Sequence, residues 1–155
     1  MKNKGFTLTE VTVTLAVLGI MSAVSVPTYF SWLPRHRLQT SVRHIYDDMN
    51  MARSRAVKTN ADIGIEFNPS NEIYRIFIDA DQDQTYNAGD TVIKTGTLED
   101  GVNITESTLT NNTYVFNSRG MSVDTTSSVY DIYLTNSSGL VMGVRVNTSG
   151  YLTII

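Results

Sequence analysis

The chain has 155 residues, a length that suits one domain with at most one appended element. Its composition, 41% hydrophobic and 17% charged, argues against disorder throughout, and its lack of cysteine excludes disulfides, zinc–thiolate sites, iron–sulfur clusters and cysteine nucleophiles. The net charge of −3 is unevenly spread, since the bases outnumber the acids from residue 35 to 59, whereas twelve acids face four bases beyond Thr59. A basic stem therefore precedes an acidic C-terminal part.

Residues 6–27 are the first predicted element, a helix that could cross a membrane. From Phe6 to Val26 no Lys, Arg or Asp occurs, and as a helix this run is roughly 30 Å long, the thickness of the hydrocarbon layer. The run is longer than the apolar part of a signal peptide and continues into an amphipathic segment, so we expect it to be retained. Glu10 interrupts it. A carboxylate facing lipid is costly and commonly marks a function, although Glu10 could instead face solvent at a fraying helix end.

The hexapeptide Gly5-Phe6-Thr7-Leu8-Thr9-Glu10 resembles the processing site of type IV pilins and type II secretion pseudopilins. The resemblance implies that residues 1–5 are a leader, that a prepilin peptidase cuts after Gly5, and that Phe6 becomes N-methylated. It also implies that Glu10 neutralises the terminal amine of a neighbouring subunit during assembly. Such a pair offsets much of the cost of placing both charges in a low dielectric.

Gly19 and Pro27 occupy positions where type IV pilins carry helix-weakening residues, so the resemblance implies that residues 19–27 partly melt in a filament. Two features depart from the common pattern. Four threonines make the first half of the span more polar than usual, and Arg35 and Arg37 follow the span closely. Lys2, Lys4 and the starting amine still favour a cytoplasmic N-terminus and a periplasmic head, the orientation that the resemblance also implies.

Residues 28–60 are predicted to form an amphipathic helical stem. Its apolar residues recur at helical spacing: Leu33, Leu38, Val42, Ile45, Tyr46, Met49, Ala52, Ala56 and Val57. We expect Pro34 to bend the start of the stem, Asn60 to stop it, and Lys58 to complement the helix dipole. The span and the stem together are predicted to form one long, interrupted helix.

The stretch Met51–Asn60 resembles the ARSEA-(V/I)-KRN motif that ends this helix in pseudopilins and minor pilins of GspH/FimT type. Arg55 replaces the usual Glu, so a salt bridge made by that Glu in relatives is not expected here. Arg53, Arg55 and Lys58 could also form a nucleic-acid face, but a solvated polar face of an amphipathic helix is the favoured interpretation.

Residues 61–155 alternate apolar and polar side chains with period two, which predicts a β-rich head. The predicted strands are 63–67, 73–78, 92–95, 102–105, 114–117, 130–134, 140–146 and 151–155. Three Asn-x-x-Gly turns, at 117–120, 136–139 and 147–150, predict successive hairpins. The fold class is therefore α+β, with an antiparallel sheet packed on the stem as in type IV pilins.

The segment 79–90 has the spacing of an EF-hand calcium loop, with oxygen-bearing side chains at its positions 1, 3, 5, 7, 9 and 12. These are Asp79, Asp81, Asp83, Thr85, Asn87 and Asp90. Against a calcium site, position 6 is Gln84 instead of Gly and the flanks are strand-like. The alternative is a turn in which the Asp side chains bond to backbone N–H groups. A structural calcium ion and an ion-free turn remain equal interpretations.

No catalytic motif is present, and His36 and His44 alone make no familiar zinc site, so an enzyme is not expected. We expect a subunit of a type II secretion pseudopilus or a type IV pilus that acts at the filament tip or in initiation. Its expected partners are other pilins, the prepilin peptidase and the assembly platform of the inner membrane. The alternative is a DNA-binding minor pilin for DNA uptake, against which the acidic head argues because phosphate contact requires Lys and Arg.

Overall fold

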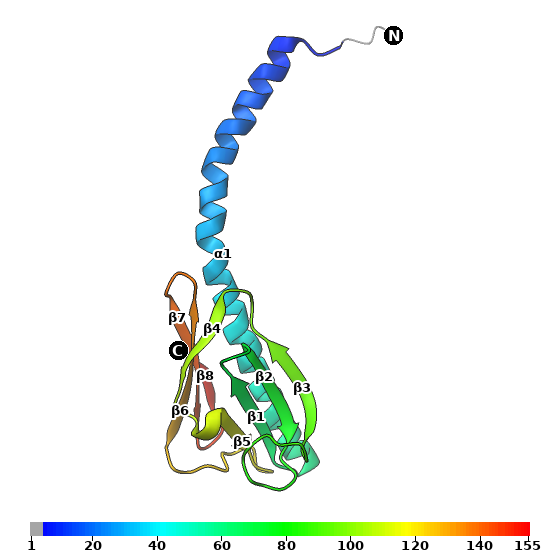
Figure 1. Cartoon of the computed structure of the whole chain (residues 1–155), viewed down its shortest axis with the longest axis vertical. Helices are drawn as coiled ribbons and strands as arrows, with labels where there is room; N and C mark the ends of the chain where they lie inside the picture. The colour runs from blue at the N-terminus through cyan, green and yellow to red at the C-terminus, as the bar shows by residue number, and fades with distance from the viewer. Residues whose placement is uncertain (1–4) are drawn as a thin grey trace. The chain divides into compact units, whose positions relative to one another are not determined.

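The structure is a computed structural model that describes residues 5–155, except the side chains of Val24, Pro27 and Thr28. In this part of the chain it has one long helix, eight strands and one short 3-10 helix (Figure 1). Their bounds are α1 Leu8–Thr59, β1 Ile63–Asn68, β2 Ile73–Ile78, β3 Thr91–Thr97, β4 Val102–Ser107, η1 Thr110–Asn112, β5 Thr113–Phe116, β6 Val129–Asn136, β7 Val141–Asn147 and β8 Leu152–Ile154. The predicted α+β class and all eight predicted strands are confirmed. By its contacts the chain divides into two units, Met1–Leu33 and Pro34–Ile155.

In the first unit, α1 starts with a threonine cap. Thr7 Oγ1 accepts a hydrogen bond from the Glu10 N–H at 3.3 Å, and the Thr7 carbonyl accepts one from the Val11 N–H at 3.2 Å. Glu10 lies in the first turn, where a negative charge complements the helix dipole. A search of the described residues finds no helix that is both long enough and apolar enough for a membrane span. The span predicted at residues 6–27 is therefore not confirmed.

In the first unit, several hydroxyl side chains donate hydrogen bonds to carbonyls of their own helix. Thr14 Oγ1 donates to the carbonyls of Glu10 and Val11, and Thr12 Oγ1 donates to the Thr9 carbonyl at 2.9 Å. Ser22 and Ser25 donate in the same way to carbonyls four residues earlier. A hydroxyl that bonds to its own helix needs no water partner. The threonines that make the sequence look polar thus leave the surface of this helix largely apolar.

The predicted interruption of the helix is wrong for this structure, because α1 continues through Gly19, Pro27 and Pro34. One glycine destabilises a helix by only about 1 kcal/mol, and a proline removes one N–H donor without disturbing the bonds further away. The Pro27 side chain, named above as an assembly residue, lies outside the described residues. Melting of residues 19–27 in a filament stays a prediction.

The predicted helix end is confirmed. Asn60 adopts a φ of 51°, and the Ala61 N–H bonds to the Ala56 carbonyl at 3.3 Å, which is the bond of a Schellman cap. Asparagine tolerates this left-handed backbone better than most residues, which explains why the helix stops here.

In the second unit, residues 34–59 of α1 bury one apolar stripe. Leu38, Val42, Ile45, Met49, Ala52 and Ala56 are all completely buried. Their steps of four and three residues keep them on one face of the helix. Val57, which the sequence places on the same stripe, is 52% exposed because it falls one position beyond that face.

Two antiparallel sheets cover the stripe where the sequence predicted one. Sheet A has the strand order β3-β2-β1-β5, and sheet B has the order β4-β6-β7-β8. The chain passes from sheet A to sheet B after β3, returns for β5, and ends in sheet B (Figure 1). Both sheets contribute to the same core, with Ile65, Tyr114 and Phe116 from sheet A and Ile132, Leu134 and Val144 from sheet B. Burial raises the pKa of Tyr114 to about 12.

The three Asn-x-x-Gly turns share one geometry. In each, the glycine has φ between 73° and 77°, and its N–H bonds to the asparagine carbonyl at 2.8–2.9 Å. The turns at 136–139 and 147–150 join β6 to β7 and β7 to β8, as predicted. The turn at 117–120 does not make a full hairpin, because it closes only one isolated bridge, Phe116 to Ser122. The chain then leaves sheet A for β6.

Candidate functional site

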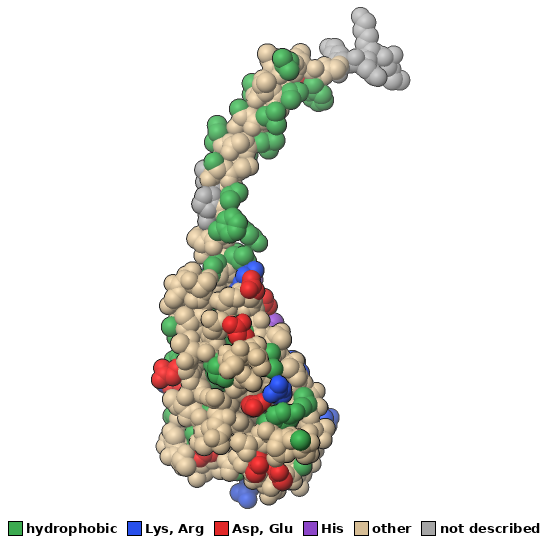
Figure 2. Space-filling view, in the orientation of Figure 1, with side chains coloured by type: hydrophobic (Ala, Val, Ile, Leu, Met, Phe, Trp, Pro, Cys, Tyr) green, Lys and Arg blue, Asp and Glu red, His purple; other side chains and the backbone are tan. Residues whose placement is uncertain are grey.

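The first candidate site is the N-terminal segment. Every described side chain from residue 5 to residue 23 is exposed, including Phe6 at 85%, Leu8 at 82% and Ile20 at 70%. Figure 2 shows apolar side chains along this part of the chain. Isolated apolar side chains on a surface are ordinary, but a continuous apolar surface marks contact with protein or lipid. This unit therefore presents an association surface.

Within that surface, Glu10 carries the one acidic side chain between residues 6 and 33. Its carboxylate has no hydrogen bond or ion pair with any residue that the structure describes, so it is available to a partner. Gly5 and Phe6 are exposed on either side of the predicted cleavage point, and a side chain added at Gly5 or Gly19 would meet no atom within 4 Å. The structure thus leaves Gly5, Phe6, Glu10 and Gly19 accessible.

The second candidate site is the connection between β2 and β3. One carboxylate oxygen from each of Asp79, Asp81 and Asp83 lies within 4.8 Å of the other two. Asp79 is buried, with 4% exposure, while Asp81 and Asp83 are exposed. Asp79 Oδ2 accepts the Gln84 N–H at 3.1 Å, but the buried Asp79 Oδ1 has no hydrogen-bond partner in the described part.

The other predicted loop residues support this cluster in different ways. The Asn87 side-chain amide donates to Asp81 Oδ2 at 2.8 Å and to Asp83 Oδ2 at 3.3 Å. Thr85 donates both its N–H and its hydroxyl to Asp83 Oδ1, each at 2.8 Å. Asp90 accepts the N–H groups of Ala80 and Asn87 and so ties the two ends of the loop together. The structure therefore brings three of the six predicted ligands close together, whereas Asp90 stabilises the loop through its backbone N–H groups.

The electrostatics of this loop are unbalanced. No Lys, Arg or His that the structure describes forms an ion pair with Asp79, Asp81, Asp83 or Asp90. Burial raises the pKa of Asp79, and the three neighbouring carboxylates raise it further, although the Gln84 N–H opposes them. The loop is anchored to sheet A through Tyr86, whose ring lies 5.4 Å from that of Phe77 and 5.2 Å from the Arg75 guanidinium carbon.

The motif residue Arg53 bonds to one turn and packs beside a second, a contact that sequence analysis missed. Arg53 Nε donates to the Gly120 carbonyl at 3.0 Å, and a side chain added at Gly120 or Gly150 would come within 3.1 Å of this nitrogen. Gly150 also approaches the Gly120 carbonyl so closely that a Cβ would overlap it. Arg55 and Lys58 are exposed, as the favoured interpretation of a solvated face expects, whereas Arg53 is half-buried and bonds across the fold. Only the tertiary fold brings residues 53, 120 and 150 together.

A polar cavity of about 420 Å³ lies between α1 and β3. On one wall, the buried Asp48 accepts hydrogen bonds from the Tyr74 hydroxyl at 2.6 Å and from Lys94 Nζ at 2.7 Å. Burial and the contact with Asp48 raise the pKa of Tyr74 well above its usual value. Tyr74 and Lys94 both bond to Asp48, so this cluster ties β3 to the stem.

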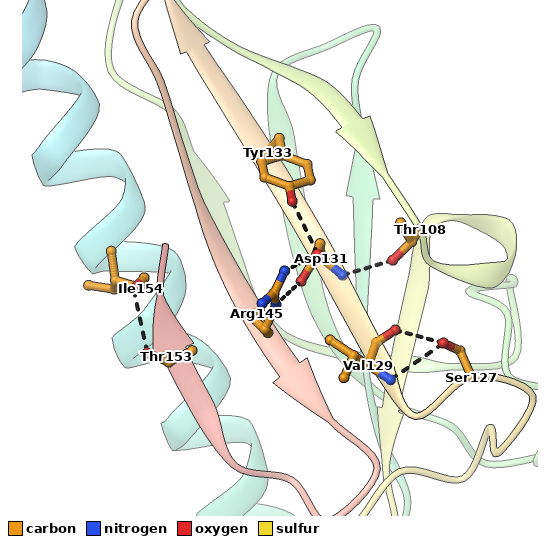
Figure 3. A network of polar contacts seen from close by, with 8 residues as sticks. All are labelled: Thr108, Ser127, Val129, Asp131, Tyr133, Arg145, Thr153 and Ile154. Carbon is orange, nitrogen blue, oxygen red and sulfur yellow. Dashed lines mark hydrogen bonds and ion pairs between the residues drawn. The ribbon is translucent and has the colours of Figure 1, made fainter.

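A second polar network lies on sheet B and is shown in Figure 3. Arg145 on β7 binds Asp131 on β6 through two bonds of 2.7 and 2.8 Å, and the Tyr133 hydroxyl donates to the same carboxylate at 3.1 Å. Arg145 and Tyr133 together hold the pKa of Asp131 below its usual range, although its burial opposes them. Every member has a partner here as well, so the network stabilises the pairing of β6 with β7.

Comparison with known proteins agrees with these observations. The family described as Type II transport protein GspH matches residues 41–150, and the Prokaryotic N-terminal methylation motif matches residues 1–26. A search of curated protein sequences finds no match.

Two solved structures share the fold. The minor pseudopilin EpsH of the type 2 secretion system of Vibrio cholerae has a TM-score of 0.57 at 14% identity, over 77% of this chain and 96% of that chain. The type IV minor pilin FimU of Pseudomonas aeruginosa has a TM-score of 0.61 at 14% identity, over 76% of this chain and 92% of that chain. At these identities the likeness shows the fold alone. Since the GspH match covers more than half of the 155 residues and the methylation motif precedes it, the chain belongs to the family described as Type II transport protein GspH.

Proposed function

We propose that this protein is a non-enzymatic filament subunit that acts by assembly. It is made as a precursor, cut after Gly5 by the prepilin peptidase and N-methylated at Phe6. It sits in the bacterial inner membrane with its N-terminus in the cytoplasm and its head in the periplasm. The assembly platform then moves it into a type II secretion pseudopilus or a type IV pilus, where it acts at the tip or in initiation.

The observation that carries this proposal is the exposed apolar segment with Glu10 in its first turn. Burial of apolar surface stabilises an assembly by roughly 25 cal/mol per Å², so these side chains favour packing against lipid or other helices. The internal hydrogen bonds of Thr12, Thr14 and Ser22 remove the polar groups that would oppose such packing. The Glu10 charge is the remaining cost.

The amine created by cleavage supplies the partner that Glu10 lacks. A buried ion pair recovers much of the desolvation of its two charges, whereas one charge left alone in such an environment costs roughly 3–5 kcal/mol. Glu10 therefore selects the register at which a new subunit enters, because only one axial position brings the neighbour's amine to the carboxylate. The matched methylation motif supports the presence of that amine.

The test is Glu10→Ala, with Glu106→Ala on the exposed surface of β4 as the control. We expect both variants to be processed and membrane-associated. Glu10→Ala should co-purify with filaments at less than a tenth of the wild-type amount, since roughly 3 kcal/mol exceeds one factor of ten. Glu106→Ala should co-purify normally. Normal incorporation of Glu10→Ala, or mass spectra of the host protein with residues 1–5 attached and no N-methyl group, would overturn the proposal.

A further inference from the structure

We propose that Asp79, Asp81 and Asp83 bind one divalent cation of the calcium type, which closes the loop between β2 and β3. This site is separate from the assembly segment. Loss of cation binding would leave the proposed filament function intact, and loss of filament incorporation would leave the cation site intact.

The spacing of the carboxylates fits one calcium ion. Calcium holds oxygen ligands at about 2.4 Å, so two ligands on opposite sides of the ion are about 4.8 Å apart. The ligand oxygens of Asp79, Asp81 and Asp83 lie within 4.8 Å of one another. All three side chains can therefore reach one ion after small rotations of the side chains. The cluster offers oxygen and no sulfur or imidazole, which favours a hard cation over zinc or copper.

The second observation is the buried Asp79. Its side chain is 96% buried, and its Oδ1 atom has no hydrogen-bond partner in the part of the chain that the structure describes. A buried carboxylate oxygen without a partner is destabilising, because it has lost its water and gained nothing in return. Asp79 Oδ2 is already held by the Gln84 N–H, so Oδ1 is the atom left for a ligand.

The two exposed members of the cluster, Asp81 and Asp83, share one hydrogen-bond donor. Asp81 Oδ2 and Asp83 Oδ2 both turn to the single amide group of Asn87, the donor that their side chains share. A neutral amide compensates little of the repulsion between two carboxylates. A divalent cation held by these oxygens and Asp79 Oδ1 would remove the repulsion and supply the missing partner. Asp90 would keep its bonds to Ala80 and Asn87 and hold the loop in shape.

The experiment is calorimetric titration of CaCl₂ or MgCl₂ into the chelator-treated full-length protein in detergent. Wild type should bind one calcium ion, more tightly than magnesium, and calcium should raise its melting temperature. Asp81→Asn and Asp83→Asn should bind calcium at least tenfold more weakly. Asp47→Asn removes the same charge from an exposed site on α1 and should bind as wild type does.

The melting temperature of Asp79→Asn provides a second test. Without calcium, this substitution should not destabilise the protein. In chelator this variant should melt no lower than wild type, since it removes an unpaired buried charge and keeps an oxygen for the Gln84 N–H. Its melting temperature should not respond to calcium. No binding by wild type at about 10 mM calcium, above the range of weak extracellular sites, would overturn the proposal. Wild-type affinity in Asp81→Asn, or an Asp79→Asn protein that melts lower than wild type in chelator, would do the same.

Discussion

Two stretches of one helix behave in opposite ways. Between residues 34 and 59, α1 buries an apolar stripe completely and leaves the other faces polar. Between residues 8 and 23, its apolar side chains lie on all faces and are all exposed. A one-sided stripe is the pattern of a helix that completes its own domain, whereas an apolar surface all round needs other molecules. The comparison teaches that residues 8–23 are suited to contact with other molecules, whereas residues 34–59 are suited to folding within one chain.

The largest expected effect separates these two stretches with the same substitution. Leu38 is completely buried and Leu18 is 58% exposed, and both lie on α1. Leu38→Ala should destabilise the head by roughly 3–5 kcal/mol, because it leaves a cavity in a packed core. Leu18→Ala should change the stability of the head by less than about 0.5 kcal/mol. Calorimetry of the full-length protein in detergent measures both.

The Leu18→Ala variant also tests incorporation into filaments. Leu18→Ala should reduce incorporation into filaments although its head melts normally, because it removes apolar surface used between chains. If Leu18→Ala lowers the melting temperature of the head as much as Leu38→Ala, the two stretches do not have separate roles and the distinction fails.

Local patterns predicted most of the elements. Period two located all eight strands, the three- and four-residue steps located the buried helix face, and asparagine at position 60 marked the helix end. These signals are local because each depends on residues within one turn or one strand. The helix continued through Gly19 and Pro34 because single breakers weaken a helix without ending it.

Contacts between distant residues were not predictable. The pairing of β1 with β5 and the division into two sheets join segments far apart in the sequence, and no short pattern encodes that choice. For the same reason the contact of Arg53 with Gly120 was missed. The spacing pointed to the loop in which three carboxylates lie close together. The distinction between Asp79 as a buried group and Asp90 as a brace required the fold.

A prediction of intermediate size tests how tightly the head packs at its turns. Gly139 and Gly150 occupy the same position of equivalent turns, with φ of 76° and 77°. A side chain at Gly139 would meet no atom within 4 Å, while one at Gly150 would overlap the Gly120 carbonyl. Gly139→Ala should therefore cost only the left-handed backbone strain of about 1 kcal/mol. Gly150→Ala should cost roughly 2–4 kcal/mol, because overpacking adds to that strain.

Chemical denaturation of the two alanine variants measures this difference directly. Equal losses of stability would mean that the turns at 117–120 and 147–150 do not approach each other closely. The same measurement on Arg53→Ala should show a smaller loss of about 1 kcal/mol, the usual contribution of one hydrogen bond.

The smallest expected effect concerns the charges on sheet B. The Arg145 guanidinium holds the pKa of Asp131 below its usual range, so the folded protein keeps this carboxylate ionised more readily than the unfolded chain does. The resulting stability is present above the unfolded pKa of about 3.9 and is lost as the pH falls through the lower folded value. Arg145→Ala should therefore lower the melting temperature by a few degrees at pH 7, and the difference from wild type should shrink as the pH falls below about 3.9. The control is Arg119→Ala. It removes the same charge from an exposed residue that forms no ion pair in the described part of the chain. Its effect on the melting temperature should not depend on pH in this way. A loss in Arg145→Ala that stays constant from pH 7 to pH 2 would mean that Arg145 stabilises sheet B by packing and not by its charge.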